Sequence, residues 1–225
     1  MCGRFNLRTK LNKLLQQFAL DTMYTDASEP GNRIFEPRYN IAPSQDVLAV
    51  RLMEGKRELY KLRWGLIPSW AKDAKIAYST INARADTVAT KPAFRSAYKK
   101  RRCLIPTDGY YEWLRVGKEK QPYLYEVDGG ELFAFAGLWE SWNDPQGETV
   151  ESFTIITTDA NELAKKVHDR MPVIIDPDDY GEWLACEEIP LIPFPPERMT
   201  CRPVSTYVNN ARNEGPQCTE PVQSS

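Results

Sequence analysis

The stretch CLIPTDGYYEWLRVGKEKQPYLYEVDGGELFAFAGL, residues 103–138, decides the fold class. Apolar and aromatic residues are frequent in it, and breaks at Gly117-Lys118 and Asp128-Gly129-Gly130 stand where hairpin turns are needed. We therefore predict a run of mostly antiparallel strands. These strands are Cys103–Pro106, Gly109–Val116, Pro122–Val127, Leu132–Leu138 and, farther along, Phe153–Thr157.

Weaker signals flank this region on both sides. Residues 2–8 alternate as a strand does, and apolar residues recur at helical spacing over about 10–20. Asn161 or Asp159 could cap a later helix. The other predictions are a loop up to about Arg38, a hairpin of Asp46–Leu52 and Glu58–Gly65, a loop over 66–82, short helices near 83–90, 92–99, Ala160–Val167 and Asp178–Cys186, and a last strand near Pro203–Val208.

Strands at short spacing with helices inserted at intervals predict an α+β fold. We expect a mostly antiparallel, barrel-like β core with short helices. The sequence contains no internal repeat, no low-complexity block and no linker, so we expect one domain over residues 1–215, followed by a polar tail over 216–225.

Charge and cysteine content exclude several classes of protein. The 225 residues carry a formal net charge of −2, which argues against a broad nucleic-acid coat but allows a local basic groove. The five cysteines are scattered and the chain has one histidine, so we expect no metal and no cofactor. No apolar run approaches the roughly 20 residues of a membrane span, and the start lacks a signal-peptide core. We expect a cytoplasmic protein, nucleoid-associated if bacterial.

The cysteine that follows the initiator methionine has unusual chemistry. Removal of Met1 would give Cys2 a free α-amine beside its thiol. These groups have reference pKa values of about 8 and about 8.5, so a fraction of each is nucleophilic near neutral pH. The amine can condense with an aldehyde to an imine, and the thiol can then close a five-membered thiazolidine. The alternative is a frayed chain end without function.

Three other side chains could take part in chemistry. His168 is the residue best suited to exchange protons near pH 7, although a lone histidine is more often a helix cap or a core residue. Glu112 lies in an aromatic strand, where burial would raise its pKa unless it forms a structural salt bridge. Asn82 could orient a substrate hydroxyl or cap a following helix.

Aromatic residues alternate with cations in the middle of the chain. Trp64, Trp70 and Tyr78 stand among basic residues, and the basic run 99–102 follows. Stacking faces interleaved with cations suit single-stranded nucleic acid. The same composition also describes core aromatics beside a solvated charged face.

Several strings occur in a fixed order over nearly the whole chain and together resemble the SOS response-associated peptidase (SRAP) family, whose members process abasic sites in DNA. They are Met1-Cys2-Gly3-Arg4-Phe5, Arg38-Tyr39-Asn40-Ile41-Ala42-Pro43, Trp64-Gly65-Leu66-Ile67-Pro68, Ile81-Asn82-Ala83-Arg84-Ala85, Asp108-Gly109-Tyr110-Tyr111-Glu112-Trp113, Val167-His168-Asp169-Arg170-Met171-Pro172 and Val204-Ser205.

The resemblance implies a role for each matching position. Met1 is removed, and Cys2 forms a thiazolidine cross-link with the ring-opened sugar of an abasic site. Glu112 would shuttle protons, His168 would act beside it as acid or base, and Asn82 would bind the sugar. The positions implied in DNA binding are Arg4, Arg84 and Arg170 for phosphates and Trp70 as an aromatic wedge.

The implied partner is single-stranded DNA, or a single-/double-strand junction, that contains an abasic site. Many bacterial relatives have a second Trp after the wedge, whereas this chain has Ala71, which puts the junction preference in doubt. The sequence does not indicate protein partners.

Three other functions fit parts of the sequence. N-terminal-nucleophile glutamine amidotransferases also begin Met-Cys-Gly, but here Arg4-Phe5 follows and their glycine-rich signatures are missing. A non-covalent reader of modified bases would use the same groove and would not need Cys2. A cysteine–histidine protease is the third alternative, although a terminal cysteine suits cleavage of its own chain better.

Overall fold

A computed structural model describes residues 2–23, 33–117 and 119–222. Met1, most of the loop expected before Arg38, and Lys118 of one expected turn lie outside the described residues. No helix in the described ranges is long and apolar enough to span a membrane.

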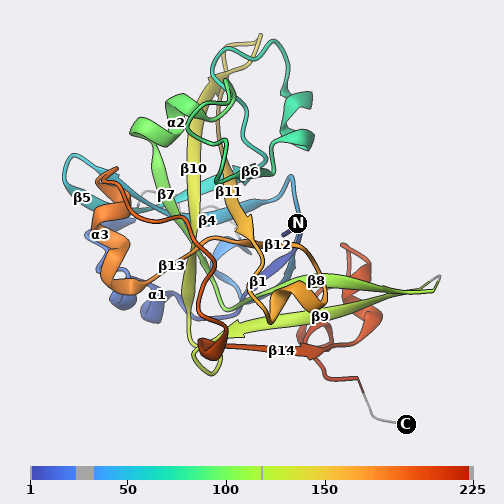
Figure 1. The fold of residues 1–225 in the computed structure, drawn as a ribbon. Coiled ribbons are helices and arrows are strands. Elements are labelled where there is room, and N and C mark those ends of the chain that lie inside the picture. The colour runs from blue at the N-terminus through green and yellow to red at the C-terminus, as the bar shows by residue number, and fades with distance from the viewer. Residues whose placement is uncertain (1, 24–32, 118, 223–225) are drawn as a thin grey trace.

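A closed β barrel forms the centre of the molecule (Figure 1). Its strands follow the order β11–β10–β7–β4–β5, and β5 pairs with β11 in parallel to complete the circle. The interior is aromatic, because Phe5, Trp64, Phe135 and Phe153 are all fully buried there. The barrel strands are β4 (Asp46–Met53), β5 (Lys56–Trp64), β7 (Arg102–Thr107), β10 (Phe133–Asn143) and β11 (Thr149–Asp159), and the short strands β2 (Thr22–Met23), β6 (Asn82–Arg84), β12 (Arg170–Pro172) and β13 (Ile174–Ile175) pair at its edges.

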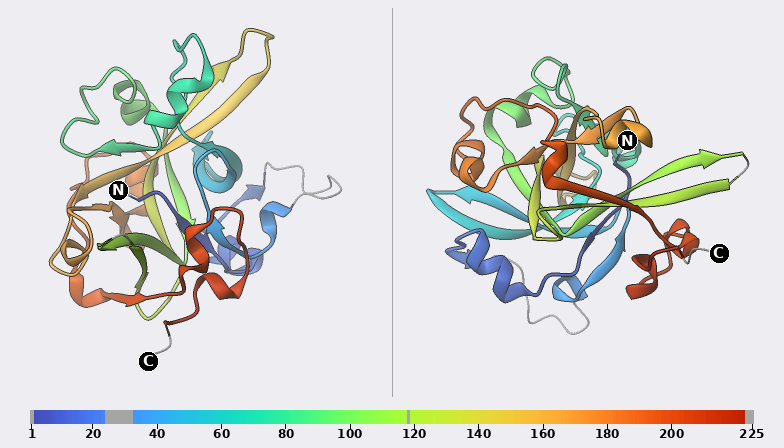
Figure 2. Two further views of the ribbon diagram at one scale, coloured as in Figure 1. Left: turned by 90° about the vertical axis from the view of Figure 1, so that its right-hand side faces the viewer. Right: turned by 60° about the horizontal axis from the view of Figure 1, so that its bottom comes forward.

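A second sheet lies against the barrel and carries the start of the chain. Its order is β14–β9–β8–β1–β3. The hairpin of β8 and β9 extends beyond the body of the molecule, as two views show (Figures 1 and 2). The bounds are β1 (Phe5–Leu7), β3 (Arg38–Ile41), β8 (Gly109–Val116), β9 (Glu119–Val127) and β14 (Met199–Pro203).

The helices are short and lie outside the barrel. The α-helices are α1 (Leu11–Gln17), α2 (Arg95–Lys100) and α3 (Tyr180–Leu184). The 3₁₀ turns are η1 (Arg33–Phe35), η2 (Ala74–Ser79), η3 (Ala164–Lys166), η4 (Pro177–Asp179), η5 (Pro196–Arg198), η6 (Thr206–Asn209) and η7 (Pro216–Cys218). The predicted α+β class with a mostly antiparallel barrel-like core is therefore confirmed.

The predicted hairpin of Asp46–Leu52 and Glu58–Gly65 is confirmed as β4 and β5, and β8 pairs with β9 as predicted. The Asp128-Gly129-Gly130 break is not a hairpin turn, because β9 pairs with β8 and β14 whereas β10 belongs to the barrel. Glu54 and Gly55 have φ values of 51° and 80°, the left-handed pair that matches the twist of a two-residue hairpin loop. The segment 66–82 is irregular apart from η2, as predicted.

Three predictions of local structure are also wrong, and in the first of them a tertiary contact outweighs the local pattern. The helix expected at 83–90 is absent, since β6 pairs with β11 instead. The helix expected at Ala160–Val167 shortens to η3, although Asn161 does accept a hydrogen bond from the Ala164 N–H at 2.8 Å. The last strand is β14 rather than 203–208, because the Ser205 hydroxyl caps η6.

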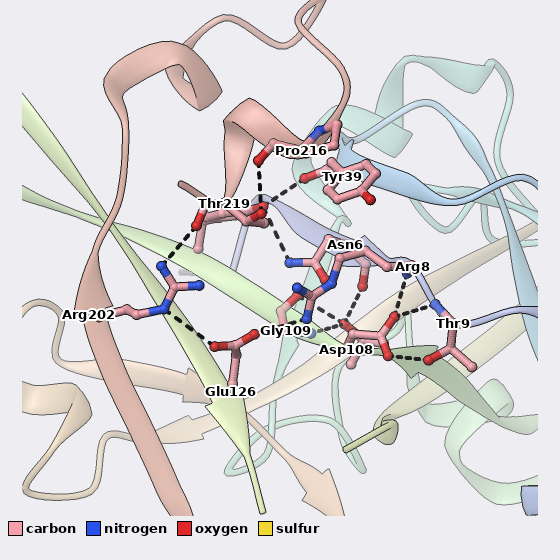
Figure 3. A network of polar contacts seen from close by, with 12 residues as sticks. Asn6, Arg8, Thr9, Tyr39, Asp108, Gly109, Glu126, Arg202, Pro216 and Thr219 are labelled. Carbon is pink, nitrogen blue, oxygen red and sulfur yellow. Dashed lines mark hydrogen bonds and ion pairs between the residues drawn. The ribbon is translucent and has the colours of Figure 1, made fainter. Parts of the chain in front are cut away.

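A carboxylate fixes the N-terminal segment on the second sheet (Figure 3). Asp108 accepts hydrogen bonds from the backbone N–H groups of Arg8 and Thr9 and from the Thr9 hydroxyl. Glu126 pairs with Arg8 at 2.9 Å and with Arg202 at 3.6 Å. Arg8 and Thr9, which follow β1, are thereby tied to Asp108, the residue just before the strand that carries Glu112.

The segment after Gly215 packs on this sheet. Cys218 is fully buried, and the carbonyl of Thr219 accepts a hydrogen bond from Arg202 at 2.8 Å. The N–H of Ser205 donates to the carbonyl of Glu220 at 2.9 Å. The last described residues therefore continue the domain's packing.

Candidate active site and nucleic-acid interface

Cys2 lies just before β1, and its side chain is fully buried. Burial raises the pKa of the thiol, and the nearby Glu112 carboxylate raises it further, while a hydrogen bond from the Arg4 backbone opposes both. In the chain that retains Met1, the Cys2 thiol is therefore neutral near pH 7. The reference pKa of a free cysteine does not apply there.

Asn82 reaches Cys2 from the first position of β6. Its Nδ2 donates a hydrogen bond to the Cys2 carbonyl at 2.8 Å. Its Oδ1 is buried and has no hydrogen-bond donor among the residues that the structure describes. No helix follows Asn82, so the capping alternative is excluded. An orphaned acceptor beside Cys2 is suited to bind a hydroxyl or an amine.

Glu112 stands in β8 with only 5% of its surface exposed. Burial raises its pKa, and the nearby His168 opposes that shift. A carboxyl group with a raised pKa can hold a proton and release it closer to neutral pH. Because Glu112 also influences the pKa of Cys2, the two side chains are electrostatic neighbours.

His168 follows η3 and lines the same cleft as Glu112, a hollow of about 390 Å³. Its Nδ1 accepts a hydrogen bond from the Arg170 N–H at 3.0 Å, yet it also lies 2.8 Å from Oδ1 of Asp169. One nitrogen cannot accept and donate at once. Nδ1 therefore accepts from the Arg170 N–H when it carries no hydrogen and donates to Asp169 when it carries one.

Arg4 lines this cleft from the N-terminal side. Its Nη1 donates to Oδ1 of Asn40 at 2.6 Å and to the carbonyl of Val208 at 3.0 Å, and its guanidinium lies 5.5 Å from the Trp113 ring centre. Burial lowers the pKa of Arg4 from its usual high value, and the group remains charged at neutral pH. The cation is thus held in place beside Glu112.

Arg84 and Arg170 line a neighbouring hollow of about 340 Å³. Arg84 is exposed and forms a two-pronged pair with Asp86, at 2.6 and 3.0 Å. Arg170 is 8% exposed and donates inward to the Thr157 carbonyl at 2.6 Å. Both arginines border the site, but each already has an internal acceptor.

The aromatic residues of the middle segment divide into two groups. Trp70 and Tyr78 are 60% and 72% exposed on the loop before β6. Trp64 is fully buried, and its Nε1 donates to the Ile81 carbonyl at 2.9 Å, so its interpretation as a stacking face is wrong. Ala71 accepts a hydrogen bond from Trp142 at 2.7 Å through its carbonyl, which anchors the residue that follows Trp70.

The basic run at 99–102 is only half available to a ligand. Arg102 is buried, with its guanidinium 4.5 Å from the Tyr98 ring centre, and Arg101 pairs with Glu140 at 2.6 Å. Lys99 and Lys100 are exposed at the end of α2. Two of the four basic residues in this run therefore serve packing or an internal ion pair, and the other two add charge to the surface.

Comparisons with known proteins bear on this arrangement. The profile of the family described as "SOS response associated peptidase (SRAP)" matches residues 1–211. This chain belongs to the SRAP family. The SRAP resemblance inferred from the sequence strings is thus confirmed.

Individual relatives match over most of their length. "Abasic site processing protein YoqW" of Bacillus subtilis strain 168 is 42% identical over 228 residues, which cover 98% of this chain and 99% of that protein. "Abasic site processing protein HMCES" of Xenopus tropicalis is 36% identical, over 82% of this chain and 66% of that protein. A crystal structure of a Bacteroides thetaiotaomicron protein has a TM-score of 0.87 and 28% identity, over 99% of this chain and 100% of that one.

The SRAP fold brings Cys2, Asn82, Glu112 and His168 together from four separate segments. Sequence reasoning did not find the residues that support them. Asn40 holds Arg4 and also donates to the carbonyls of Asn210 and Asn213, at 3.0 and 2.8 Å. The only signal in the sequence for Asn40 was its position in one of the strings that resemble the family. A contact across more than 160 positions leaves no local pattern.

Proposed function

We propose that this chain processes abasic sites in DNA by forming a covalent thiazolidine cross-link through Cys2 after Met1 is removed. Membership of the SRAP family supports the general activity, as do the printed names of YoqW and HMCES. The cross-link would shield the reactive sugar during repair. The chain would act as a self-processing peptidase once, and as a cross-linking or lyase-type enzyme that turns over slowly.

The reaction balances without a cofactor. Cleavage after Met1 would convert the Cys2 nitrogen from an amide into an amine. That amine attacks the C1′ aldehyde of the ring-opened abasic sugar, and loss of one water gives an imine. The thiol then adds to the same carbon and its proton passes to the nitrogen, which closes the five-membered ring.

The observation that carries the proposal is the hydrogen bond from Asn82 to the Cys2 carbonyl, at 2.8 Å. It fixes Cys2 beside the buried Glu112, where an acid and base is needed for imine formation. Asn82 keeps Oδ1 for the sugar hydroxyl. His168, with two proton-dependent partners, would exchange protons with Glu112 or with the sugar oxygen.

The DNA would cross the site between the loop that carries Trp70 and the β8–β9 hairpin, because β6, which follows that loop, carries Asn82 beside Cys2, and β8 carries Glu112 beside Cys2. Arg4, Arg84 and Arg170 would bind phosphates, and Trp70 would stack on a base next to the abasic position. Single-stranded DNA and single-/double-strand junctions fit such a wedge.

A cross-linking assay tests the proposal. Wild-type protein incubated with a single-stranded oligonucleotide that contains one abasic site should give an adduct that survives heat and denaturing electrophoresis. Cys2→Ala and Cys2→Ser should give no stable adduct, because either change removes the sulfur that closes the ring. Heat-resistant adducts from Cys2→Ala protein would refute the mechanism.

A further inference from the structure

Two cations stand directly opposite each other on the projecting β8–β9 hairpin. Arg115 of β8 and Lys120 of β9 are paired residues in the strand register. Both side chains are exposed. Like charges at directly opposite positions of an antiparallel pair destabilise it, so this arrangement has a cost in the free protein.

Neither cation is neutralised within the part of the chain that the structure describes. The ion pairs found there involve other residues, and neither side chain donates a hydrogen bond to an acidic group. Arg8 and Arg202, on the same sheet, both pair with Glu126. The contrast marks Arg115 and Lys120 as cations suited to an anion from outside the chain.

The two cations line the cleft that holds Glu112 and His168. Arg4 lines it as well, and among the described residues that line the cleft Glu112 is the only acidic one. Arg115 is three positions from Glu112 along β8, roughly 10 Å at the rise of a strand. At that separation the cations would meet nucleotides next to the reacting sugar and not the sugar itself.

This side of the cleft is held in shape. Nε1 of Trp113 donates to Oδ1 of Asn209 at 2.6 Å, and Nδ2 of Asn209 donates to the Lys120 carbonyl at 3.1 Å. Asn209 ends η6, so the half of the hairpin that is nearer its turn is fastened to the C-terminal part of the chain. A fixed backbone lowers the entropy lost when the two side chains bind a ligand.

We propose that Arg115 and Lys120 bind the backbone phosphates of the DNA strand that flanks the target sugar. This inference rests on the proposed function and deepens it, because it assigns a further stretch of the DNA path to the β8–β9 hairpin. Phosphates would relieve the repulsion between the paired cations and would release counterions on binding. The contact is sequence-independent and does not touch the reacting atoms.

The test measures non-covalent binding to an undamaged single-stranded oligonucleotide over a range of salt concentrations. The magnitude of the slope of log K for binding against log salt should fall by about 0.7 in each of the single variants Arg115→Gln and Lys120→Gln. It should fall by about 1.4 in the double variant. Affinity at low salt should fall several-fold in each. The midpoint of thermal unfolding should not fall, because either change removes a like-charge pair.

Lys56→Gln is the matched control. Lys56 is an exposed cation on the β4–β5 hairpin, opposite Met53 and outside the cleft. Its loss should leave the affinity and the salt slope unchanged. A double Arg115/Lys120 variant with wild-type affinity, or with weaker binding at an unchanged slope, would overturn the phosphate role.

Cross-linking to an abasic oligonucleotide separates this inference from the proposed function. At limiting DNA the double variant should form the adduct more slowly than wild type, and an excess of DNA should offset this loss, since the reacting groups are intact. If wild-type protein formed no adduct while the salt slopes behaved as expected, the proposed chemistry would fail and the phosphate contact would stand. If wild-type protein formed the adduct while the salt slopes of the variants were unchanged, the phosphate contact would fail and the proposed chemistry would stand.

Discussion

Glu112 connects the stability of the protein with the proposed chemistry. Its carboxyl is buried beside Cys2 and His168, and burial raises its pKa above the usual 4.5. The aromatic sequence around it predicted this burial. The neutral, fully buried thiol of Cys2 was not predictable, because it depends on which segments cover the chain start.

Glu112→Gln should stabilise the protein at neutral pH and slow cross-linking. Below about pH 4, the carboxyl is protonated in the folded and the unfolded chain alike. The stability that the protonated carboxyl contributes is then fully present. As the pH rises through the raised folded pKa, ionisation favours the unfolded chain, so wild-type stability is lost and the advantage of the variant grows. Urea unfolding at about pH 4.5 and about pH 7.5 measures the difference.

The same variant should cross-link on the order of 10²–10⁴ times more slowly if Glu112 is the acid and base. Glu151→Gln is a control, because Glu151 pairs with Arg51 at 2.7 Å outside the cleft. A stability advantage that shrinks as the pH rises would contradict the assignment of a raised pKa.

Two adjacent tyrosines of β8 should respond in opposite ways to loss of their hydroxyl groups. The Tyr110 hydroxyl is buried and has no hydrogen-bond partner among the described residues. The Tyr111 hydroxyl donates to the Tyr39 carbonyl at 2.7 Å and accepts from Asn6 at 3.3 Å. Tyr110→Phe should leave the free energy of unfolding equal or higher, whereas Tyr111→Phe should lower it by about 1–3 kcal/mol. Denaturant unfolding of both variants checks the contrast, and a larger loss in Tyr110→Phe would contradict it.

At the scale of elements, the strands with strong local patterns were predictable and the strands defined by pairing were not. β8, β9 and the β4–β5 hairpin carry alternation and turn residues of their own. β6 has three residues, and β14 lies among prolines. These two form because β11 and β9 offer free edges, which is information held elsewhere in the sequence.

Asp108 fastens the end of β1 to the turn before β8. Asp108→Asn keeps the shape but weakens the charge-assisted bonds to Arg8 and Thr9, and should lower the free energy of unfolding by roughly 1.5–3 kcal/mol. Because β1 follows Cys2, cross-linking should slow as well. Thr9→Val removes only one of these bonds and should cost less. Equal unfolding free energies for Asp108→Asn and wild type would contradict this role.

The loop before β6 should contribute to DNA binding with little effect on folding. Trp70 is 60% exposed, so Trp70→Ala should change the free energy of unfolding by less than about 0.5 kcal/mol. Loss of a stacking platform should weaken binding to single-stranded DNA by about 1–3 kcal/mol. Fluorescence anisotropy with a labelled oligonucleotide measures this, and Ile192→Ala, at another exposed apolar residue, is the control. Unchanged affinity in Trp70→Ala would contradict the wedge.

For the whole molecule, the sequence predicted the class of core, a barrel, but not the strand pairing that closes it. The spacing of strands indicated a barrel-like core, but the parallel pairing of β5 with β11 joins segments that have no common local signal. Gly65 stands at this closure. Its N–H donates to the Phe153 carbonyl at 2.9 Å, and an added Cβ would lie 2.8 Å from the Ala77 carbonyl oxygen.

Gly65→Ala should destabilise the whole barrel by more than about 2 kcal/mol, because its φ of +120° strains any side chain and the backbone leaves no room. Gly55→Ala is the matched control, with φ of +80° and no atom within 4 Å of the added Cβ. It should cost about 1 kcal/mol. Calorimetric midpoints compare the two, and equal shifts would contradict the importance of the closure.

Intact mass spectrometry of the protein, before and after incubation with a single-stranded oligonucleotide that carries one abasic site, tests the central claim most directly. We expect the purified chain to lack Met1, and the product to gain the mass of the oligonucleotide minus one water at Cys2. A chain that lacks Met1 but forms no adduct, or an adduct on a residue other than Cys2, would contradict the account.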